Sequence, residues 1–222
     1  MSVQGRFSSE FLTPIAETQG DIQTIFDLVF CAWPTLKIDL TVMPSGNLEN
    51  NITWHFYGAI VAEKSRLTDD GTQQYCFSFL PGTEIIDGKG NRLGITDLQI
   101  QFGTDERNRF TIEAKLLNKQ RTSNAGAYVG KEGMGRFISG QYGREVQWGG
   151  MMGYVLDGDT DKARKSVTDK IEKERQTLGM LKTETLKNST IRKDVYETSH
   201  TRQTGTPLTI YHLFLPVVPH QN

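Results

Sequence analysis

The sequence predicts an α/β protein in which a central mixed β-sheet is flanked by helices. Two long segments near the N-terminus have a helical apolar period, strand-like runs follow from residue 75 to 117, and helix and strand patterns then alternate toward the C-terminus. With 222 residues, 36% of them apolar, the chain is long enough to bury a core. No repeat or linker divides it, so we expect residues 1–222 to form a single domain. Its motif-bearing core is expected at about 45–156, and a C-terminal helix with two strands at about 160–218.

Two amphipathic helices are predicted in the first third of the chain. Residues 16–33 end before Pro34, which cannot continue a helix, and their apolar stripe consists of Ile22, Ile25, Phe26, Val29 and Phe30. Residues 45–67 begin at Ser and Asn residues that are typical N-caps and end near TDDG. The buried face of this second helix is expected to consist of Leu48, Ile52, Phe56, Ala59 and Ile60.

Strands are predicted next, at residues 75–80, 95–102 and 109–117. The Gly-rich turn DGKGNRLG precedes the second of these strands, and the turn GTDERN separates the second from the third. The last two strands are therefore expected to form an antiparallel hairpin.

Helix and strand patterns alternate in the remaining part. After a polar loop, we expect a short helix within residues 130–147 and a buried strand within 149–158. Residues 160–178 read as an amphipathic helix whose Lys and Arg residues interleave with Asp and Glu, which is typical of a solvated face. Two strands within residues 190–217, joined by the loop TRQTGT, end the chain.

Composition argues against several classes of function. The formal net charge of −1 gives no bulk attraction to nucleic acid, so nucleic-acid binding needs a local basic patch. The sequence has no GK[ST] phosphate loop, dinucleotide fingerprint or Ser-His-Asp pattern, so nucleotide hydrolysis and dehydrogenase chemistry have no support. No apolar run has the length of a signal peptide or a membrane span. Cys31 and Cys76 lie in apolar contexts, so we expect buried free thiols in a cytoplasmic protein without membrane contacts.

The predicted hairpin places charged side chains together. Side chains alternate along a strand, so Asp97 lies on the face of the first strand opposite its apolar residues, and Glu113 and Lys115 do so on the second. A turn centred near Asp105 brings Asp97 opposite Glu113 and Lys115. Two interpretations follow. The residues form a solvated strand face with a Glu–Lys pair, or the two carboxylates and the carbonyl of Ala114 hold Mg²⁺ or Mn²⁺.

In the second interpretation the chemistry is phosphodiester hydrolysis. A hard divalent cation stabilises charge on a phosphate and lowers the pKa of bound water, and the neighbouring Lys115 positions that water.

This arrangement resembles the PD-(D/E)XK nuclease superfamily, whose signature is an Asp on one strand followed by an acidic residue, any residue and Lys on the next. The matching positions are Asp97, Glu113 and Lys115, and the resemblance covers roughly residues 45–156. The family often adds a Glu from a preceding helix, for which Glu49 is the candidate. It lies about 100° around the helix from Leu48 and so at the edge of the buried face. One departure is that Thr96, not Pro, precedes Asp97.

The resemblance implies a restriction-endonuclease-like fold and a Mg²⁺- or Mn²⁺-dependent endodeoxyribonuclease. Asp97 and Glu113 would be metal ligands, and Asp97, Glu113, Lys115 and Glu49 catalytic residues. It also implies DNA as the partner, a role in restriction or phage defence, and a second copy or another defence-system protein as candidate protein partners. The alternative is a catalytically inactive nucleic-acid-binding or assembly subunit that retains the fold, which the near-neutral charge favours.

Two weaker patterns complete the analysis. The glycine-dense segment from residue 133 to 155 contains Arg136, Tyr142, Arg144 and Trp148. We expect its glycines and aromatics to form a tightly packed helix–strand junction, whereas Arg136 stays open between a phosphate contact and a structural role. The four histidines have no metal-binding spacing and are expected to be structural, with the loop at 199–202 a weaker candidate for substrate contact.

Overall fold

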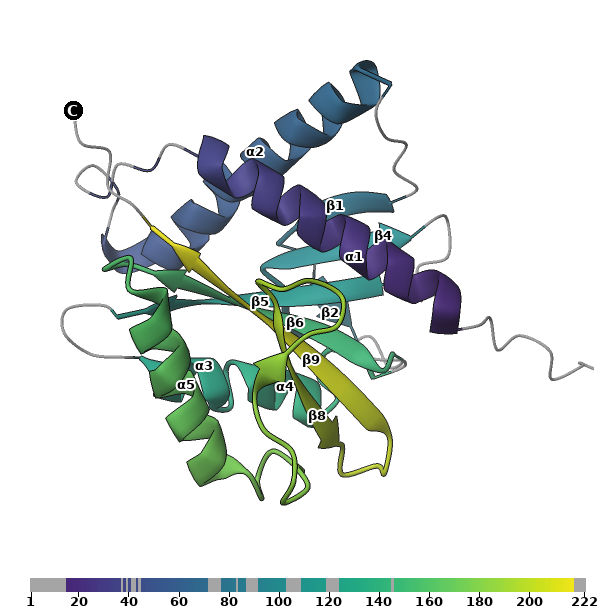
Figure 1. The fold of residues 1–222 in the computed structure, drawn as a ribbon, viewed down its shortest axis with the longest axis vertical. Coiled ribbons are helices and arrows are strands. Elements are labelled where there is room, and N and C mark those ends of the chain that lie inside the picture. The colour runs from purple at the N-terminus through teal and green to yellow at the C-terminus, as the bar shows by residue number, and fades with distance from the viewer. Residues whose placement is uncertain are drawn as a thin grey trace, which may run out of the picture.

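The computed structural model describes residues 15–36, 38, 40, 43, 45–71, 77–82, 84–86, 92–102, 109–118, 124–144 and 146–217. A seven-stranded mixed sheet forms its centre, with helices on both faces (Figure 1). One face is covered by α1 (Ile15–Ala32) and α2 (Leu48–Asp69), and the other by α3 (Ala125–Val129), α4 (Met134–Ile138) and α5 (Thr160–Glu174). The predicted α/β class with a mixed sheet flanked by helices is confirmed.

The sheet has the strand order β1-β4-β5-β6-β9-β8-β7. Its parallel pairs, β5 with β6 and β6 with β9, lie in the middle, and the other neighbours are antiparallel. Parallel strands buried on both faces are continuously apolar, and the central β6 is buried from its second residue on. The strands are β1 (Phe77–Pro81), β4 (Leu98–Phe102), β5 (Arg109–Leu117), β6 (Trp148–Val155), β7 (Lys187–Asn188), β8 (Tyr196–Thr201) and β9 (Pro207–Pro216).

The two long helices form where their apolar stripes predict. On α1, Ile22, Ile25, Phe26 and Val29 are fully buried, and the helix ends at Ala32, where Pro34 takes part in a 3₁₀ turn, Trp33–Thr35. On α2 the residues buried against the sheet are Ile52, Thr53, Phe56 and Ile60. The predicted start at residue 45 is three residues early, because Ser45–Asn47 form a 3₁₀ turn before the helix. None of the described helices is long and apolar enough to cross a membrane.

The predicted strand 95–102 is divided in the structure. Residues 92–94, predicted as turn, belong to β3 (Arg92–Ile95), which pairs with β2 (Glu84–Ile86) in a separate two-stranded sheet. The chain bends at Thr96 and Asp97, and β4 begins at Leu98. The bend is fixed because the carbonyl of Asp97 accepts a hydrogen bond from Gly82 N–H (3.3 Å). This division takes Asp97 out of the sheet ladder and frees its side chain for other contacts.

Three further expectations need correction, and three others concern residues that the structure does not describe. Part of the predicted polar loop is α3, because Ala125, Tyr128 and Val129 bury an apolar face. Cys31 is exposed, not buried, since the core-facing residues of α1 lie on the other side of that helix. The predicted helix 160–178 ends at Glu174. Cys76, His220 and the turn around Asp105 lie outside the described residues.

The predicted junction of glycines and aromatics is confirmed, and it sets the position of α4. A Cβ on Gly149 would lie 2.5 Å from the Phe137 ring, so α4 packs directly on β6 only because the strand has glycine there. The buried Arg202 holds the loop after α4, donating to the carbonyls of Phe137 (3.0 Å), Val146 (2.9 Å) and Gly143 (2.8 Å). Both contacts fix where Arg136 of α4 points.

Candidate functional site

The four predicted site residues converge at the end of β5. The register of β4 and β5 pairs Leu98 with Ile112. The next position along brings Asp97 beside Glu113. Glu49 comes from the first turn of α2. That turn is tied to the sheet through Thr53, whose hydroxyl donates to Glu49 O (3.0 Å) and lies 3.0 Å from Tyr154 Oη of β6. The predicted placement of Asp97 by Glu113 and of Glu49 toward the hairpin is confirmed.

Two of the carboxylates bond the backbone of β5 where the sheet ladder stops. Pairing between β4 and β5 ends at Leu98 and Ile112, so the N–H groups of Ala114 and Leu116 lie beyond it. Asp97 Oδ2 accepts a hydrogen bond from Ala114 N–H (2.7 Å), and Glu49 Oε2 accepts one from Leu116 N–H (3.1 Å). Each carboxylate therefore has one oxygen anchored to the strand.

Lys115 lies at the centre of the cluster. Its Nζ is 2.8 Å from Glu113 Oε1, 2.9 Å from Glu49 Oε1 and 2.7 Å from the carbonyl oxygen of Ala114. An ammonium has three N–H donors, so these three oxygens use all of them. The ammonium is surrounded by the type of oxygen shell that a hard cation prefers.

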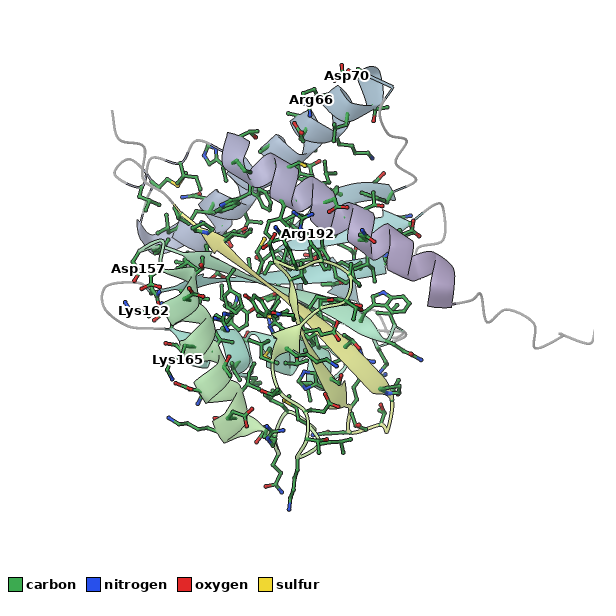
Figure 2. All side chains as sticks on the ribbon, in the orientation of Figure 1. Arg66, Asp70, Asp157, Lys162, Lys165 and Arg192 are labelled. Atoms are coloured by element: carbon green, nitrogen blue, oxygen red, sulfur yellow. The ribbon has the colours of Figure 1, made fainter. Side chains whose placement is uncertain are left out.

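The cluster is buried at Glu113 and half-buried at Asp97, Lys115 and Glu49, unlike the more exposed ion pairs of the same protein. The pairs Arg66–Asp70 (3.2 Å) and Lys162–Asp157 (2.9 Å) lie at the margin of the molecule (Figure 2). Glu113 is only 2% exposed, so the interpretation as a solvated strand face does not describe it. Its Oε2 is buried without a hydrogen-bond partner, which is costly for a carboxylate.

Burial controls the protonation of these groups. Burial, with the nearby charge of Asp97, raises the pKa of Glu113 to about 7 even though Lys115 opposes the shift. Burial likewise raises the pKa of Asp97 against the effects of Lys115 and the Ala114 N–H. Burial lowers the pKa of Lys115, but the surrounding carboxylates outweigh it and the net shift is upward. The lysine stays a cation, whereas the raised pKa values of Asp97 and Glu113 make the charged forms of these two carboxyls costly.

Arg136 and Tyr142 border the cluster on the side of α4. Arg136 Nη1 lies 3.7 Å from Glu113 Oε1, and Nη2 forms an ion pair with Glu132 (2.5 Å). The same guanidinium donates to the Tyr142 hydroxyl, which donates to the carbonyl of Ile95 (2.6 Å). The sequence left the role of Arg136 open, and the structure brings it to Glu113. Glu132, its other partner, lies in the turn before α4, so no helical spacing in the sequence indicated this contact.

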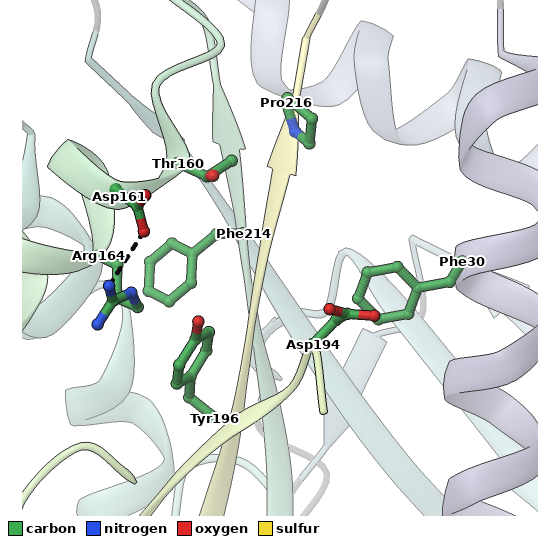
Figure 3. Close-up of a pocket in the computed structure, with 8 residues that line it drawn as sticks. All are labelled: Phe30, Thr160, Asp161, Arg164, Asp194, Tyr196, Phe214 and Pro216. Atoms are coloured by element: carbon green, nitrogen blue, oxygen red, sulfur yellow. Dashed lines mark hydrogen bonds and ion pairs between the residues drawn. The ribbon is translucent and has the colours of Figure 1, made fainter. Parts of the chain in front are cut away.

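An open pocket of about 290 Å³ adjoins the cluster and shares Asp97 with it. Asn50, Thr53 and Trp54 of α2 form one wall, and Ile95 and Thr96 are part of the other. A separate pocket of about 240 Å³ lies where α5 begins (Figure 3). Its Arg164 is paired with Asp161 (3.0 Å) and lies over the Tyr196 ring at 5.2 Å, so that charge is already balanced. The pocket beside Asp97 is the one of these two that adjoins a carboxylate with an unpartnered oxygen, Glu113.

The donor set of the cluster fits a hard divalent cation. Asp97, Glu113 and the Ala114 carbonyl supply only oxygen, and Glu113 Oε2 has an unused lone pair. Within the described part of the chain, no three His, Cys, Asp or Glu side chains group as a metal site. Mg²⁺ usually binds one or two carboxylates and retains water, so a pair of carboxylates suits it better than a complete protein cage.

Comparisons with known proteins add no relative. No protein-family model, curated protein or solved structure matches this chain. The function of the cluster therefore has to be argued from its own geometry.

None of the other described residues that the sequence analysis singled out lies in the cluster. Arg144 is exposed, Trp148 is half-buried and His55 is exposed on α2. His200 and His212 are buried in a separate hydrogen-bond network. His200, expected in a loop at 199–202, lies in β8 and is structural, as are the Thr53 and Arg202 contacts that position the site.

Proposed function

We propose that this protein is a metal-dependent nuclease of restriction-endonuclease-like fold that hydrolyses phosphodiester bonds of DNA with Mg²⁺ or Mn²⁺. The observation that carries the proposal is the oxygen shell around Lys115 together with the unpartnered Glu113 Oε2. Buried carboxylates that are incompletely bonded are expensive to maintain, and such groups concentrate at functional sites.

Each residue has a distinct role in the proposed reaction. Asp97, Glu113 and the carbonyl of Ala114 would hold the cation, which supplies charge stabilisation at the phosphate and a water of lowered pKa. Lys115 orients the attacking water and offsets charge on the phosphate. Glu49 holds the Lys115 ammonium in place through the 2.9 Å contact.

The biological setting proposed here rests on the PD-(D/E)XK resemblance alone. It favours restriction or phage defence, with DNA as substrate and a second copy of the chain or another defence-system protein as partner. The specific observation behind the alternative, an inactive binding or assembly subunit, is that the Lys115 ammonium already fills the shell of oxygens. A lysine that never leaves this shell would exclude the cation.

Plasmid and oligonucleotide cleavage with Mg²⁺ or Mn²⁺ tests the proposal. Asp97→Asn and Glu113→Gln are expected to reduce cleavage by at least about 100-fold, the scale for removing one preorganised electrostatic group. Lys115→Ala should lose cleavage to a similar degree but keep the rise in melting temperature that added cation produces in wild type. Asp169→Asn, which removes a carboxylate from the exposed Lys165–Asp169 pair of α5, is the matched control and should cleave like wild type.

Metal-dependent cleavage that survives both carboxylate substitutions would overturn this site. If wild type shows neither cleavage nor a cation-induced rise in melting temperature, the inactive binding subunit becomes the better explanation.

A further inference from the structure

The pocket beside Asp97 has an aromatic platform on its rim. Trp54 is 57% exposed, which is unusual for so large an apolar side chain. Its ring packs on one side, where Tyr57 meets it edge-on at a centroid distance of 6.1 Å. Ile95, 42% exposed, lines the same pocket. An exposed ring that packing already orients loses little entropy on binding a flat ligand.

The distribution of charge separates the pocket from the cluster. Among the residues that the structure describes, no Lys or Arg lines the pocket, and the one charged residue in this lining is Asp97. Lys115 and Arg136 lie around Glu113, which is outside this lining, and Arg136 Nη1 also donates to the carbonyl of Ile95 (3.4 Å). A phosphate group would therefore lie at the cluster, where these two side chains and the proposed cation offset the carboxylates, and it is disfavoured in the pocket. The pocket itself suits a neutral, planar group, because the exposed lining residues Trp54 and Asn50 supply an aromatic face with an amide beside it, whereas Thr53 and Thr96 are buried.

We propose that Trp54 stacks on an unpaired nucleobase of the strand whose phosphate lies at the Asp97–Glu113 cluster. The inference rests on the proposed nuclease function and specifies its substrate as single-stranded DNA. In a duplex a base is stacked and paired on both sides, so it cannot present its face to Trp54 without leaving the helix. Aromatic stacking is the usual means of binding single strands, and it tolerates any base sequence.

Oligonucleotide binding without divalent cation tests the inference separately from catalysis. With EDTA present, a single-stranded oligonucleotide should quench the tryptophan fluorescence of the full chain, and the matching duplex should bind more weakly. Trp54→Ala should weaken single-strand binding by roughly 5- to 100-fold, the range for one base–aromatic stack. Trp54→Phe should retain most of the affinity while losing most of the quenching. Val61→Ala, which alters another exposed apolar residue of α2 outside the pocket, is the matched control and should match wild type.

The outcomes distinguish the two proposals. If wild type cleaves DNA through Asp97 and Glu113 but Trp54→Ala binds and cleaves single strands like wild type, the stacking inference is wrong and the nuclease stands. If Trp54→Ala loses binding while no protein cleaves, the catalytic proposal fails and the nucleobase site stands. Tighter binding of duplex than of single strand overturns the inference. So does a Trp54→Ala protein whose only change is a smaller particle in sedimentation, since Trp54 would then contact a second copy.

Discussion

Two buried polar clusters lie on the same sheet and differ in how completely they are bonded. One joins Tyr128 of α3, Thr198 and His200 of β8 and His212 of β9, all of them 4% exposed or less. The other is the cluster of Glu49, Asp97, Glu113 and Lys115 at the end of β5. Both remove polar groups from water. In the first cluster every ring nitrogen and hydroxyl has a protein partner. In the second, Glu113 Oε2 has none.

The acceptors around each ring set the tautomers in the histidine network. Leu178 O can only accept, so His200 Nδ1–H donates to it (2.9 Å), and the Thr198 hydroxyl donates to His200 Nε2 (2.7 Å). Thr198 Oγ1 in turn accepts from His212 Nε2–H (2.8 Å), which leaves His212 Nδ1 as an acceptor for the Tyr128 hydroxyl (3.1 Å), whose single proton also faces the carbonyl of Met151 (3.2 Å). Burial holds both rings neutral, lowering the pKa of His200 to about 4 and that of His212 to about 3.

The difference in hydrogen bonding separates a structural polar cluster from a candidate functional one in this fold. Every ring nitrogen of the neutral network has a protein partner, and the network lines neither of the two pockets described above, so it specifies the packing of α3 on β8 and β9. The charged cluster keeps an unpartnered oxygen on Glu113 and borders an open pocket. Folding alone does not require that arrangement, and a ligand would explain it.

The largest stability effect is expected in the histidine network. Thr198→Val removes the hydroxyl that bonds both rings, leaving two buried nitrogens unpaired at about 1–3 kcal/mol each, or about 3 kcal/mol in all. Urea unfolding measures the loss, and Thr209→Val, a half-buried threonine of β9, is the control with little expected change. Nuclease activity per folded molecule should be unaltered. A loss below about 0.5 kcal/mol would show that water replaces the hydroxyl and that the network is not closed.

The sequence was informative where the relevant contacts are local. Asp97, Glu113 and Lys115 follow from alternation along one hairpin, and Glu49 follows from its angle on a helix. Arg136 and Tyr142 reach the cluster only because Gly149 lets α4 approach β6 and because Arg202 fixes the following loop. No periodicity encodes those contacts.

Dependence on packing also explains where the fold predicted from the sequence was wrong. The apolar context around Cys31 suggested burial, but on a helix neighbouring residues point in directions about 100° apart, so buried neighbours do not imply a buried cysteine. The strand predicted at 95–102 bends at Asp97 because of bonds to Gly82 and Ala114, both distant in sequence. Helix and strand types were predictable from patterns, whereas bends and short elements depend on packing.

The second prediction is that the two clusters act on stability with opposite pH dependence. Each histidine has a lowered pKa in the folded state, so its stabilisation is present above about pH 6.5 and is lost as the pH falls, by about 1.4 kcal/mol per pH unit. Glu113 has a raised pKa, about 7 against an ordinary 4.5, so its contribution is present below pH 4.5 and is lost as the pH rises toward 7.

Between pH 4.5 and 6.5, wild type therefore has two histidine terms, partly offset by one from Glu113 and by one of the same sign from Asp97, whose pKa is also raised. Glu113→Gln should steepen the rise of unfolding free energy with pH by about 1.4 kcal/mol per unit, as measured by urea unfolding in EDTA. His212→Gln should flatten it. The exposed Glu174→Gln should follow the wild-type curve. An unchanged slope in Glu113→Gln would mean that the carboxyl does not titrate in this range.

The smallest expected effect is on the stability of Glu113→Gln at pH 8. Whether this variant is more or less stable than wild type tests most directly whether the two clusters differ in purpose. Without divalent cation the variant should be more stable than wild type by about 1 kcal/mol, because replacing a buried charged group by a neutral one of the same shape removes its desolvation cost. Lys115 keeps Glu49 and the Ala114 carbonyl as partners. Added Mg²⁺ should reverse the order, since wild type gains about 1.4 kcal/mol for each tenfold excess of free cation over Kd, and the variant lacks a ligand. Thermal melts with EDTA and with Mg²⁺ measure both orders. A variant less stable than wild type in EDTA would mean that Glu113 is a structural partner of Lys115, and the two clusters would then serve the same purpose.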